Sequence, residues 1–345
     1  MRSISGLTRA ATFAATLLLL PTLAHAQQTV RIAQGFPALS FLPIWAARAL
    51  DTFPAAGLQA TIVQPGGDPA ALAALDAGDV DLAAVGTESA LRAIGKGQPF
   101  EIVYNLMSKV TLELVVSKSF LEKAGVKPGD PLEKRIAALK DATIGVGAIG
   151  GTQETAARWL VEKGGLDPKA DIKIAQVGSP PALQAALEKK RIDAFMLSPP
   201  AGYVATKAGD GVILISLGDE FPLLAKQPYL VMVAKKPIDD KASGLIVKTA
   251  EAMQAASAAL VKDPEPNAMK IQKQFFAKAD PAAIVSAVKA LNGGIAGGGA
   301  LDVEAIRNQL QFSKEVGTKY GKEFDAATSQ NDMWTNSFVE KASKK

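Results

Sequence analysis

Hydrophobic residues along the chain fall into two alternating patterns. Between short apolar runs, apolar residues recur every three or four positions, as Leu42, Ala46 and Ala49 do, which predicts helices with one buried face. Strands that alternate with such helices predict an α/β fold with mostly parallel sheets. The short, almost continuous apolar runs that predict buried strands lie at residues 30–33, 61–64, 80–85, 100–105, 143–147 and 192–197.

The stretch 143–168 shows this pattern most completely. Its apolar run ends at glycines, Thr152 is placed to begin a helix, and Gly164 and Gly165 are placed to end it. A glycine loop of this kind leaves backbone N–H groups free at the start of the helix, where a polar or anionic group can bind.

A similar sequence pattern occurs twice, at an offset of 112 residues. Alanine-rich helices can match by chance, but Gln, Gly, Pro, Leu and Asp in one register favour a duplication. Two similar α/β halves predict two lobes, and ligands of such sheets bind at the carboxyl ends of strands. The equivalent loops of the two halves should therefore converge on one cleft. The matching residues are Gln64, Gly66, Pro69, Ala70, Ala73, Ala74, Leu75 and Asp81 in the first half, and Gln176, Gly178, Pro181, Ala182, Ala185, Ala186, Leu187 and Asp193 in the second.

Two extended stretches, 112–117 and 229–234, follow the two halves and are predicted to carry the chain between lobes. They divide the chain into lobe 1, residues 27–112 and 230–345, and lobe 2, residues 113–229. After Lys236 the pattern is helical without partner strands, so extra C-terminal helices are expected to pack on lobe 1. These helices are predicted at 242–261, 281–291, 303–320 and 331–342.

The first 26 residues have the pattern of a cleaved signal peptide. Arg2 and Arg9 make the start positive, an apolar run of 11 residues follows, and residues 24–26 read Ala-His-Ala, a cleavage signal. The run is shorter than the roughly 20 residues that span a bilayer. We expect residues 1–26 to be removed on export to the periplasm.

Composition excludes several functions once this segment is removed. The chain has no cysteine, and its single histidine, His25, lies in the signal peptide. The mature protein therefore lacks Ser-His-Asp and Cys-His catalytic groups, a His/Cys zinc site and a lipid-bearing cysteine. Loss of Arg2 and Arg9 lowers the formal net charge from +4 to +2, and basic residues are interspersed with acids, so a nucleic-acid partner is not expected.

The residues Gly145, Gly147 and Gly150 satisfy the G-x-G-x-x-G pattern of dinucleotide-binding loops. Two observations argue against that reading. The first two glycines fall inside the predicted strand, and the first copy of the repeat lacks the pattern. We expect no cofactor, and we interpret the loop as a solute-binding loop or as a tight strand–helix turn.

The predicted helix starts supply the candidate ligand-binding residues. Thr87 and Thr152 could meet a solute across the cleft, although ordinary capping explains them as well. Glu88 and Glu154 would repel a bare anion. A ligand that carries an amine or several hydroxyl groups therefore remains a possible alternative. Trp45 and Trp159 are expected in the cores. The candidates are Phe36, Ser40, Phe41, Gly66, Gly67, Thr87, Glu88, Gly150, Gly151, Thr152, Gln153, Ser179 and Ser198.

In their order and spacing, several of these segments resemble the nitrate/sulfonate/taurine-type periplasmic solute-binding proteins of ABC importers. The resemblance runs from about residue 29 to the C-terminus. The family usually has Gly-Ser where this chain has Gly151-Thr152. The segments that carry the resemblance are 42–47 (LPIWAA), 74–83 (ALDAGDVDLA), 144–152 with 165–168 (GLDP), and 186–199.

The resemblance implies a type II-like periplasmic-binding-protein fold, with two crossings between the lobes. It further implies a monomer without enzymatic activity that closes on a small organic solute, a sulfonate, a carboxylate or a related compound, and docks on an ABC permease. A related thiamine-pyrimidine synthase uses an active-site histidine with pyridoxal phosphate, and the mature chain has no histidine. The alternatives are binding of a thiamine-precursor pyrimidine, a carboxylate- or lysine-based enzyme, and a sensor for a membrane kinase.

Overall fold

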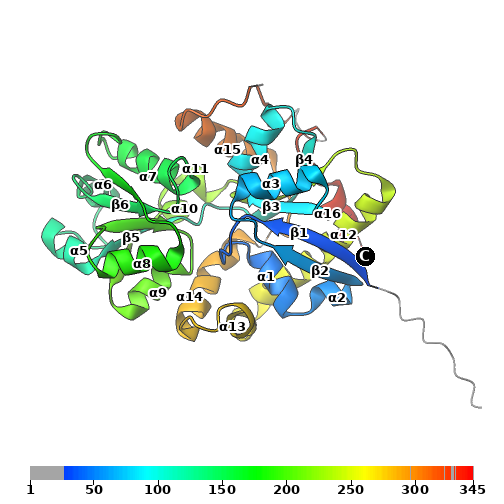
Figure 1. The fold of residues 1–345 in the computed structure, drawn as a ribbon, viewed down its shortest axis with the longest axis horizontal. Helices are drawn as coiled ribbons and strands as arrows, with labels where there is room; N and C mark the ends of the chain where they lie inside the picture. The colour runs from blue at the N-terminus through cyan, green and yellow to red at the C-terminus, as the bar shows by residue number, and fades with distance from the viewer. Residues whose placement is uncertain (1–26, 296, 322, 328–329, 331, 345) are drawn as a thin grey trace, which may run out of the picture.

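The computed structural model describes residues 27–295, 297–321, 323–327, 330 and 332–344. The predicted signal peptide lies outside the described residues. The fold is mixed α/β, as predicted, with two five-stranded sheets in two lobes that lie side by side (Figure 1). Among the described residues, no helix has both the length and the apolar character needed to cross a bilayer.

Lobe 1 is built on the sheet of order β2-β1-β3-β10-β4. Its strands are β1 (Gln28–Gln34), β2 (Leu58–Val63), β3 (Leu82–Gly86), β4 (Phe100–Met107) and β10 (Leu230–Lys235). The helices that connect its first four strands are α1 (Leu42–Ala49), α2 (Thr52–Ala55), α3 (Asp68–Ala77) and α4 (Thr87–Gly95).

Lobe 2 is built on the sheet of order β7-β6-β8-β5-β9. Its strands are β5 (Glu113–Ser117), β6 (Thr143–Val146), β7 (Lys173–Gln176), β8 (Ala194–Leu197) and β9 (Gly211–Ser216). Its helices are α5 (Lys118–Ala124), α6 (Leu132–Ala137), α7 (Thr152–Lys163), α8 (Pro180–Glu188), α9 (Ala201–Ala208), α10 (Leu217–Glu220) and α11 (Pro222–Ala225).

The two sheets have the same strand arrangement, and the repeated residues hold it in the same way. The Asp81 carboxylate accepts a hydrogen bond from the Arg31 N–H at 2.8 Å, and its own N–H donates to the Arg31 carbonyl. In lobe 2 the Asp193 carboxylate accepts from the Thr143 N–H at 2.8 Å, and its N–H donates to the Thr143 carbonyl. Both pairs are separated by the repeat offset, so the sequence repeat is also a structural repeat.

The two predicted linkers are strands rather than connections, which corrects the sequence analysis. β5 pairs antiparallel with β8 and β9, and β10 pairs antiparallel with β3 and β4. Each sheet therefore contains two antiparallel pairings and is mixed rather than mostly parallel. These stretches form strands inside the sheets rather than exposed linkers because they are buried: all five residues of β5 and the first five of β10 are buried. The crossings are the short segments next to these strands, at 108–112 and 226–229.

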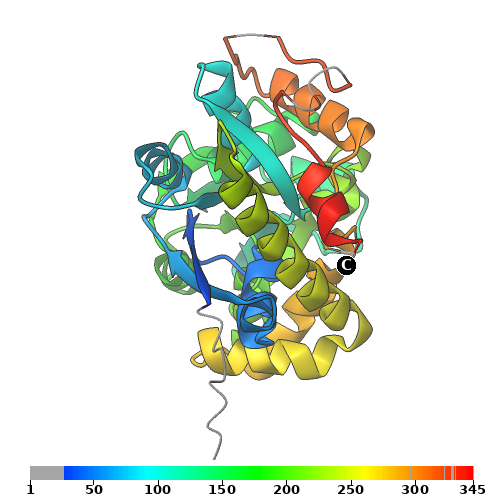
Figure 2. The same cartoon turned by 90° about the vertical axis from the view of Figure 1, so that its right-hand side faces the viewer.

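The C-terminal region consists of helices, one of which the sequence analysis missed. The missed helix is α13, which begins at Pro264. The predicted helix 303–320 ends at Glu315, because Gly317 has a left-handed φ of 71°. Figure 2 shows the long helix α12 crossing lobe 1, where it packs on α1. The helices are α12 (Asp240–Lys262), α13 (Pro264–Phe275), α14 (Pro281–Leu291), the 3₁₀ turn η1 (Asn292–Gly294), α15 (Val303–Glu315) and α16 (Ser337–Ala342).

These helices also touch lobe 2, which the sequence analysis did not predict. α14 packs against α9, and α15 packs against α11. Trp159 of α7, expected in the core of lobe 2, lies where the lobes meet: its ring contacts Phe221 of lobe 2 and Phe312 of α15. Its Nε1 donates to Glu315 at 2.9 Å, and Lys163 forms an ion pair with the same carboxylate at 2.8 Å. The two lobes are therefore in direct contact along α7 and α15.

Candidate functional site

A chain of hydrogen bonds connects the end of β3 in lobe 1 with the end of β8 in lobe 2 through both crossings. The Thr87 N–H, at the start of α4, donates to the Tyr229 carbonyl at 3.1 Å. The Tyr229 hydroxyl lies 3.3 Å from Oγ of Ser198, the residue that follows β8, and the Thr111 hydroxyl donates to that same Oγ at 2.9 Å. We call Thr87, Thr111, Ser198 and Tyr229 the junction. It joins the equivalent strand ends of both lobes, so the predicted convergence holds for Thr87 and Ser198.

Asp68 lies beside the junction in lobe 1. The sequence suggests a helix cap, but Asp68 is itself the first residue of α3, and its Oδ2 accepts a hydrogen bond from the Gly86 N–H at 3.0 Å. Its Oδ1 has no hydrogen-bond partner among the described residues, and a Cβ on Gly35 would lie 2.5 Å from this oxygen. The carboxylate therefore covers the ends of β1 and β3, and glycine at position 35 leaves room for it.

Burial governs the electrostatics of this carboxylate. Asp68 is 8% exposed, and desolvation raises its pKa, while the nearby Ser89 hydroxyl and the hydrogen bond from the Gly86 N–H partly oppose that rise. Burial also raises the pKa of Tyr229 to about 12, with the negative charge of Asp68 adding to the effect. The Asp68 carboxylate is therefore close enough to act on the junction electrostatically.

Several other buried polar atoms near the strand ends and crossings have no partner within the described part of the chain. Two of these atoms are the hydroxyls of Ser40 and Thr87, residues that are each 1% exposed. Two more are the side-chain carbonyl oxygens of the buried Gln34 and Gln227. Leaving a buried polar group without a hydrogen bond costs about 1–3 kcal/mol. Such groups are suited to a solute that supplies the missing bonds.

Two apolar side chains are exposed on the loops that lead into the helices. Phe36, on the loop after β1, is 37% exposed and lies edge-on to the fully buried Phe41 at 5.6 Å between ring centroids. Ile149, on the glycine loop of lobe 2, is 56% exposed. Phe36 and Ile149 could therefore contact an organic solute, whereas Phe41 belongs to the core of lobe 1.

The glycine loop of lobe 2 is occupied by its own chain. The Glu154 carboxylate accepts a hydrogen bond from the Gly150 N–H at 2.6 Å and pairs with Arg158 at 2.7 Å. The Gly151 N–H donates to the Ala148 carbonyl, and Thr152 is exposed. The loop therefore offers fewer free N–H groups to an anion than its sequence suggests.

The structure does not bring Glu88 to the junction. One of its carboxylate oxygens accepts hydrogen bonds from Gln309 at 3.1 Å, from Tyr320 at 2.8 Å and from Ser313. The other lies 3.5 Å from Arg92 of the same helix. Glu88 therefore ties α4 to α15 and the segment that follows α15.

The remaining candidates lie in the loops around the site. Gly66 and Gly67 turn the chain into α3 with φ of 93° and 152°. The Gln153 side chain lies over Gly147 of the lobe 2 loop. Ser179 is exposed immediately before α8.

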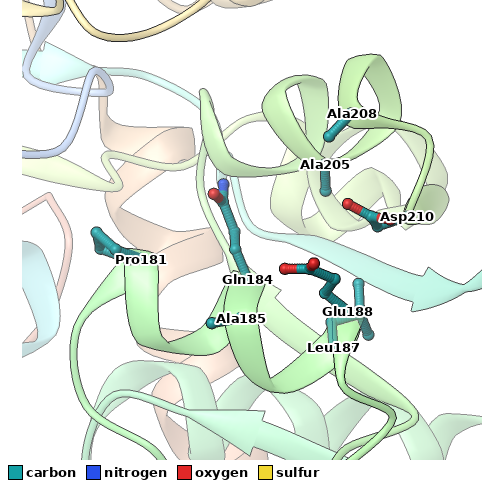
Figure 3. A pocket seen from close by; sticks show the side chains of 8 residues that line it. All are labelled: Pro181, Gln184, Ala185, Leu187, Glu188, Ala205, Ala208 and Asp210. Carbon is teal, nitrogen blue, oxygen red and sulfur yellow. The ribbon is translucent and has the colours of Figure 1, made fainter.

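Two surface pockets lie elsewhere on lobe 2. One, of about 250 Å³, opens between α8 and α9, where Gln184, Glu188 and Asp210 line it (Figure 3). The other, of about 490 Å³, lies beside β7 and α8. Neither is lined by a site residue predicted from the sequence. We place the candidate site at the junction because Thr87 belongs to it and Asp68 lies beside it. Each has a buried side-chain oxygen without a partner among the described residues.

Sequence reasoning missed the residues that connect the lobes. Asp68 looked like a helix cap, Tyr229 looked like the start of a linker, and Thr111 lies immediately before the other predicted linker. Gln34 and Gln227 carried no local signal. A chemical signal did exist for Asp68, because an acidic residue in a glycine loop at a strand end is placed to face a ligand.

Comparisons with known proteins agree with this architecture. No protein of curated function matches the chain significantly. A solved structure from Bordetella bronchiseptica RB50 shares 24% sequence identity at a TM-score of 0.71, and the match covers 92% of this chain and 98% of that one. The zinc-bound ligand-binding component of an ABC-type import system from Staphylococcus aureus shares 16% identity at a TM-score of 0.71, with 92% and 100% covered.

The alkanesulfonate-binding protein of Xanthomonas axonopodis pv. citri, bound to MOPS, shares 17% identity at a TM-score of 0.63, with 89% and 98% covered. These likenesses confirm the predicted two-lobed fold, which the chain shares with binding components of ABC import systems. The profile of the NMT1-like family matches residues 15–273, about three quarters of the chain. The chain therefore belongs to the NMT1-like family.

Proposed function

We propose that this protein is a periplasmic substrate-binding protein. It captures a small organic solute, a sulfonate, a carboxylate or a related compound, between its lobes and delivers it to an ABC transporter permease. The observation that carries the proposal is the junction, where Thr87 of lobe 1 and Ser198 of lobe 2 are linked through both crossings. The likeness to binding components of ABC import systems supports it.

The proposed mechanism is closure by population shift. With the lobes apart, water solvates Ser40, Thr87 and Asp68. A solute bound between the lobes replaces that water with fixed hydrogen bonds, which favours the closed arrangement because those contacts exist only there. The permease would then recognise the closed form. The proposed receptor is a monomer, with lobe limits at 112/113 and 229/230 and residues 1–26 removed.

A second candidate, an acid–base enzyme, is favoured by one observation. Burial raises the pKa of both Asp68 and Glu113, and buried carboxylates of this kind also occur as catalytic acids. The two functions differ in what becomes of the bound compound. A receptor returns it unchanged, whereas an enzyme converts it.

The test is a thermal-shift panel of sulfonates, carboxylates, aromatic acids, amines and pyrimidines, followed by calorimetry and mass spectrometry of the recovered compound. A receptor predicts one compound class that raises the Tm by mass action, binds one-to-one and is recovered intact. Loss of uptake of that compound in a deletion strain would connect binding to transport. Conversion of the compound, or no binding across the whole panel, would contradict the receptor.

A further inference from the structure

Each lobe buries an acidic side chain. Besides Asp68 in lobe 1, Glu113 at the start of β5 in lobe 2 is 4% exposed. In the antiparallel pairing of β5 with β8, Glu113 lies opposite Leu197, the residue before Ser198. Glu113 Oε2 has no hydrogen-bond partner in the described part of the chain, and a Cβ on Gly202, near the start of α9, would lie 2.6 Å from this oxygen. Each lobe thus brings one buried carboxylate with a free oxygen.

Buried positive charge does not balance these two carboxylates. Among the described residues, the one buried cationic side chain is Arg135 of α6, and Glu220 holds it with two hydrogen bonds of 2.6 and 2.9 Å. Lys109, which acts electrostatically on Glu113, pairs with Asp219. A bare anion brought to the junction would therefore be desolvated beside the Asp68 carboxylate without a buried cation to compensate.

The two carboxylate oxygens of Asp68 differ in their contacts: Oδ2 accepts a hydrogen bond, whereas Oδ1 accepts none from the described residues. Its Oδ2 braces the end of β3 through the Gly86 N–H, and this bond would suffice for a purely structural role. Its Oδ1 is buried, lies over Gly35 and accepts no bond. A carboxylate oxygen accepts hydrogen bonds and donates none when ionised, so its natural partner is an N–H or O–H donor. Charge-assisted bonds from an amine or amidine are the stronger kind.

We propose that the solute presents an N–H donor, an amine or an amidine-type group, to Asp68 Oδ1. This inference rests on the proposed receptor function and narrows its ligand to compounds with an N–H donor, whatever acidic group the compound also has. The Ser40 and Thr87 hydroxyls, which have no partner, then bond to the remaining polar atoms of the solute.

The test uses compounds that differ only in the N–H donor. The pairs are 2-aminoethanesulfonate and ethanesulfonate, benzylamine and benzyl alcohol, and 4-aminopyrimidine and pyrimidine, together with any binder from the panel above. We expect the N–H member to bind at least tenfold more tightly than its partner in calorimetry. Asp68→Asn should reduce that binding at least tenfold, because the Gly86 N–H holds the amide oxygen and turns the NH₂ group toward the donor of the solute.

Two further variants control the experiment. Asp76→Asn lies at the other end of α3, where Asp76 pairs with Lys235 at the surface, and it should leave binding unchanged. If Asp68→Asn fails to fold, Gly35→Ala serves instead, because it displaces the carboxylate and keeps its charge. Gly35→Ala should also weaken binding of the compound with the N–H donor. Circular dichroism checks the fold of each variant.

The possible failures can be told apart. If the partner without an N–H binds as tightly, or if Asp68→Asn keeps full affinity, the inference is overturned and the receptor stands. If a panel compound without any N–H donor proves to be the solute, the inference is likewise overturned. If no compound binds one-to-one, the receptor function fails, and the inference fails with it.

Discussion

The Thr87 hydroxyl is buried at the start of α4 without a partner, although the N–H of the same residue donates to Tyr229. Thr87→Val keeps the side-chain volume and removes only the hydroxyl. We expect solute affinity to fall about 5- to 10-fold, the worth of one hydrogen bond of ~1 kcal/mol. The free protein should be as stable as wild type or slightly more so. Calorimetry with the solute and thermal unfolding measure the two effects.

A matched control for Thr87→Val is Ser117→Ala at the start of α5. Ser117 caps that helix by accepting a hydrogen bond from the Phe120 N–H at 3.1 Å. Its loss should lower stability by about 1 kcal/mol and leave affinity unchanged. Unchanged affinity in Thr87→Val would remove Thr87 from the site.

The raised pKa of Glu113 predicts how the stability of the protein depends on pH. Burial, aided by the negative charge of Asp219 and opposed by Lys109, raises the pKa of Glu113 to about 8. The folded state therefore holds this proton more tightly than the unfolded chain, so the stabilisation is complete below the unfolded pKa of about 4.3 and is lost as the pH rises through 8. Glu113→Gln has no proton to lose. It should exceed wild type in stability at pH 9 by roughly 1–3 kcal/mol.

Urea unfolding of wild type and Glu113→Gln at pH 5 and pH 9 tests this. Comparison of the two proteins isolates Glu113 from Asp68, whose pKa burial also raises. An equal stability difference at both pH values would contradict the assignment.

At the scale of elements, Glu88 connects α4 to α15. Its carboxylate is bonded to Gln309, Ser313 and Tyr320, so Glu88→Gln should lower stability by about 1–2 kcal/mol through weakened charge-assisted bonds. It should leave affinity within twofold of wild type, because Glu88 lies away from the junction. Urea unfolding and amide exchange in α15 measure the effect.

The exposed Glu122 of α5 provides the control, since Glu122→Gln should change neither quantity. A large loss of affinity in Glu88→Gln, without a loss of stability, would show that Glu88 does face the solute.

Local pattern was enough to predict most strands and helices, because apolar runs and glycine stops are local signals. It failed where partners are distant in sequence. The segment that forms β10 looked like a linker, since nothing local shows that Leu230 pairs with both Gly86 and Met107. The helix α13 was missed because Pro264 and Pro266 resemble helix breakers, although proline is tolerated in the first turn of a helix.

The same distinction holds for the candidate site. Residues that directly follow a buried strand, such as Thr87 and Ser198, are found from local spacing. The importance of Asp68 depends on Gly86, which is 18 residues away, and on Tyr229 in the second crossing. Two residues can share a site without any signal in the sequence between them, so only the fold identifies this part of it.

At the scale of the whole molecule, contacts between α7 and α15 hold the lobes together. Glu315 accepts from Trp159 and pairs with Lys163, both of lobe 2. Glu315→Gln should weaken the closed arrangement and lower affinity about 3- to 10-fold without touching the solute, because apparent affinity scales with the closed fraction. Calorimetry gives the affinity, and stopped-flow fluorescence should show a faster release of solute.

Glu265→Gln is the matched control. The Lys289–Glu265 pair has the same 2.8 Å separation as the Lys163–Glu315 pair but joins α13 and α14 within the C-terminal helices. Glu265→Gln should leave the affinity for the solute and the rate of its release unchanged. An equal effect of both variants would show that surface charge, rather than lobe contact, governs binding.

The most direct test of the account is the distance between the lobes with and without solute. The chain has no cysteine, so Gln64→Cys and Gln176→Cys, at exposed and equivalent positions of the repeat, can carry spin labels without background. The account predicts a broad distribution of distances for the free protein and one narrow, shifted distribution at saturating solute. An identical distribution in both conditions would contradict closure of the lobes around a solute.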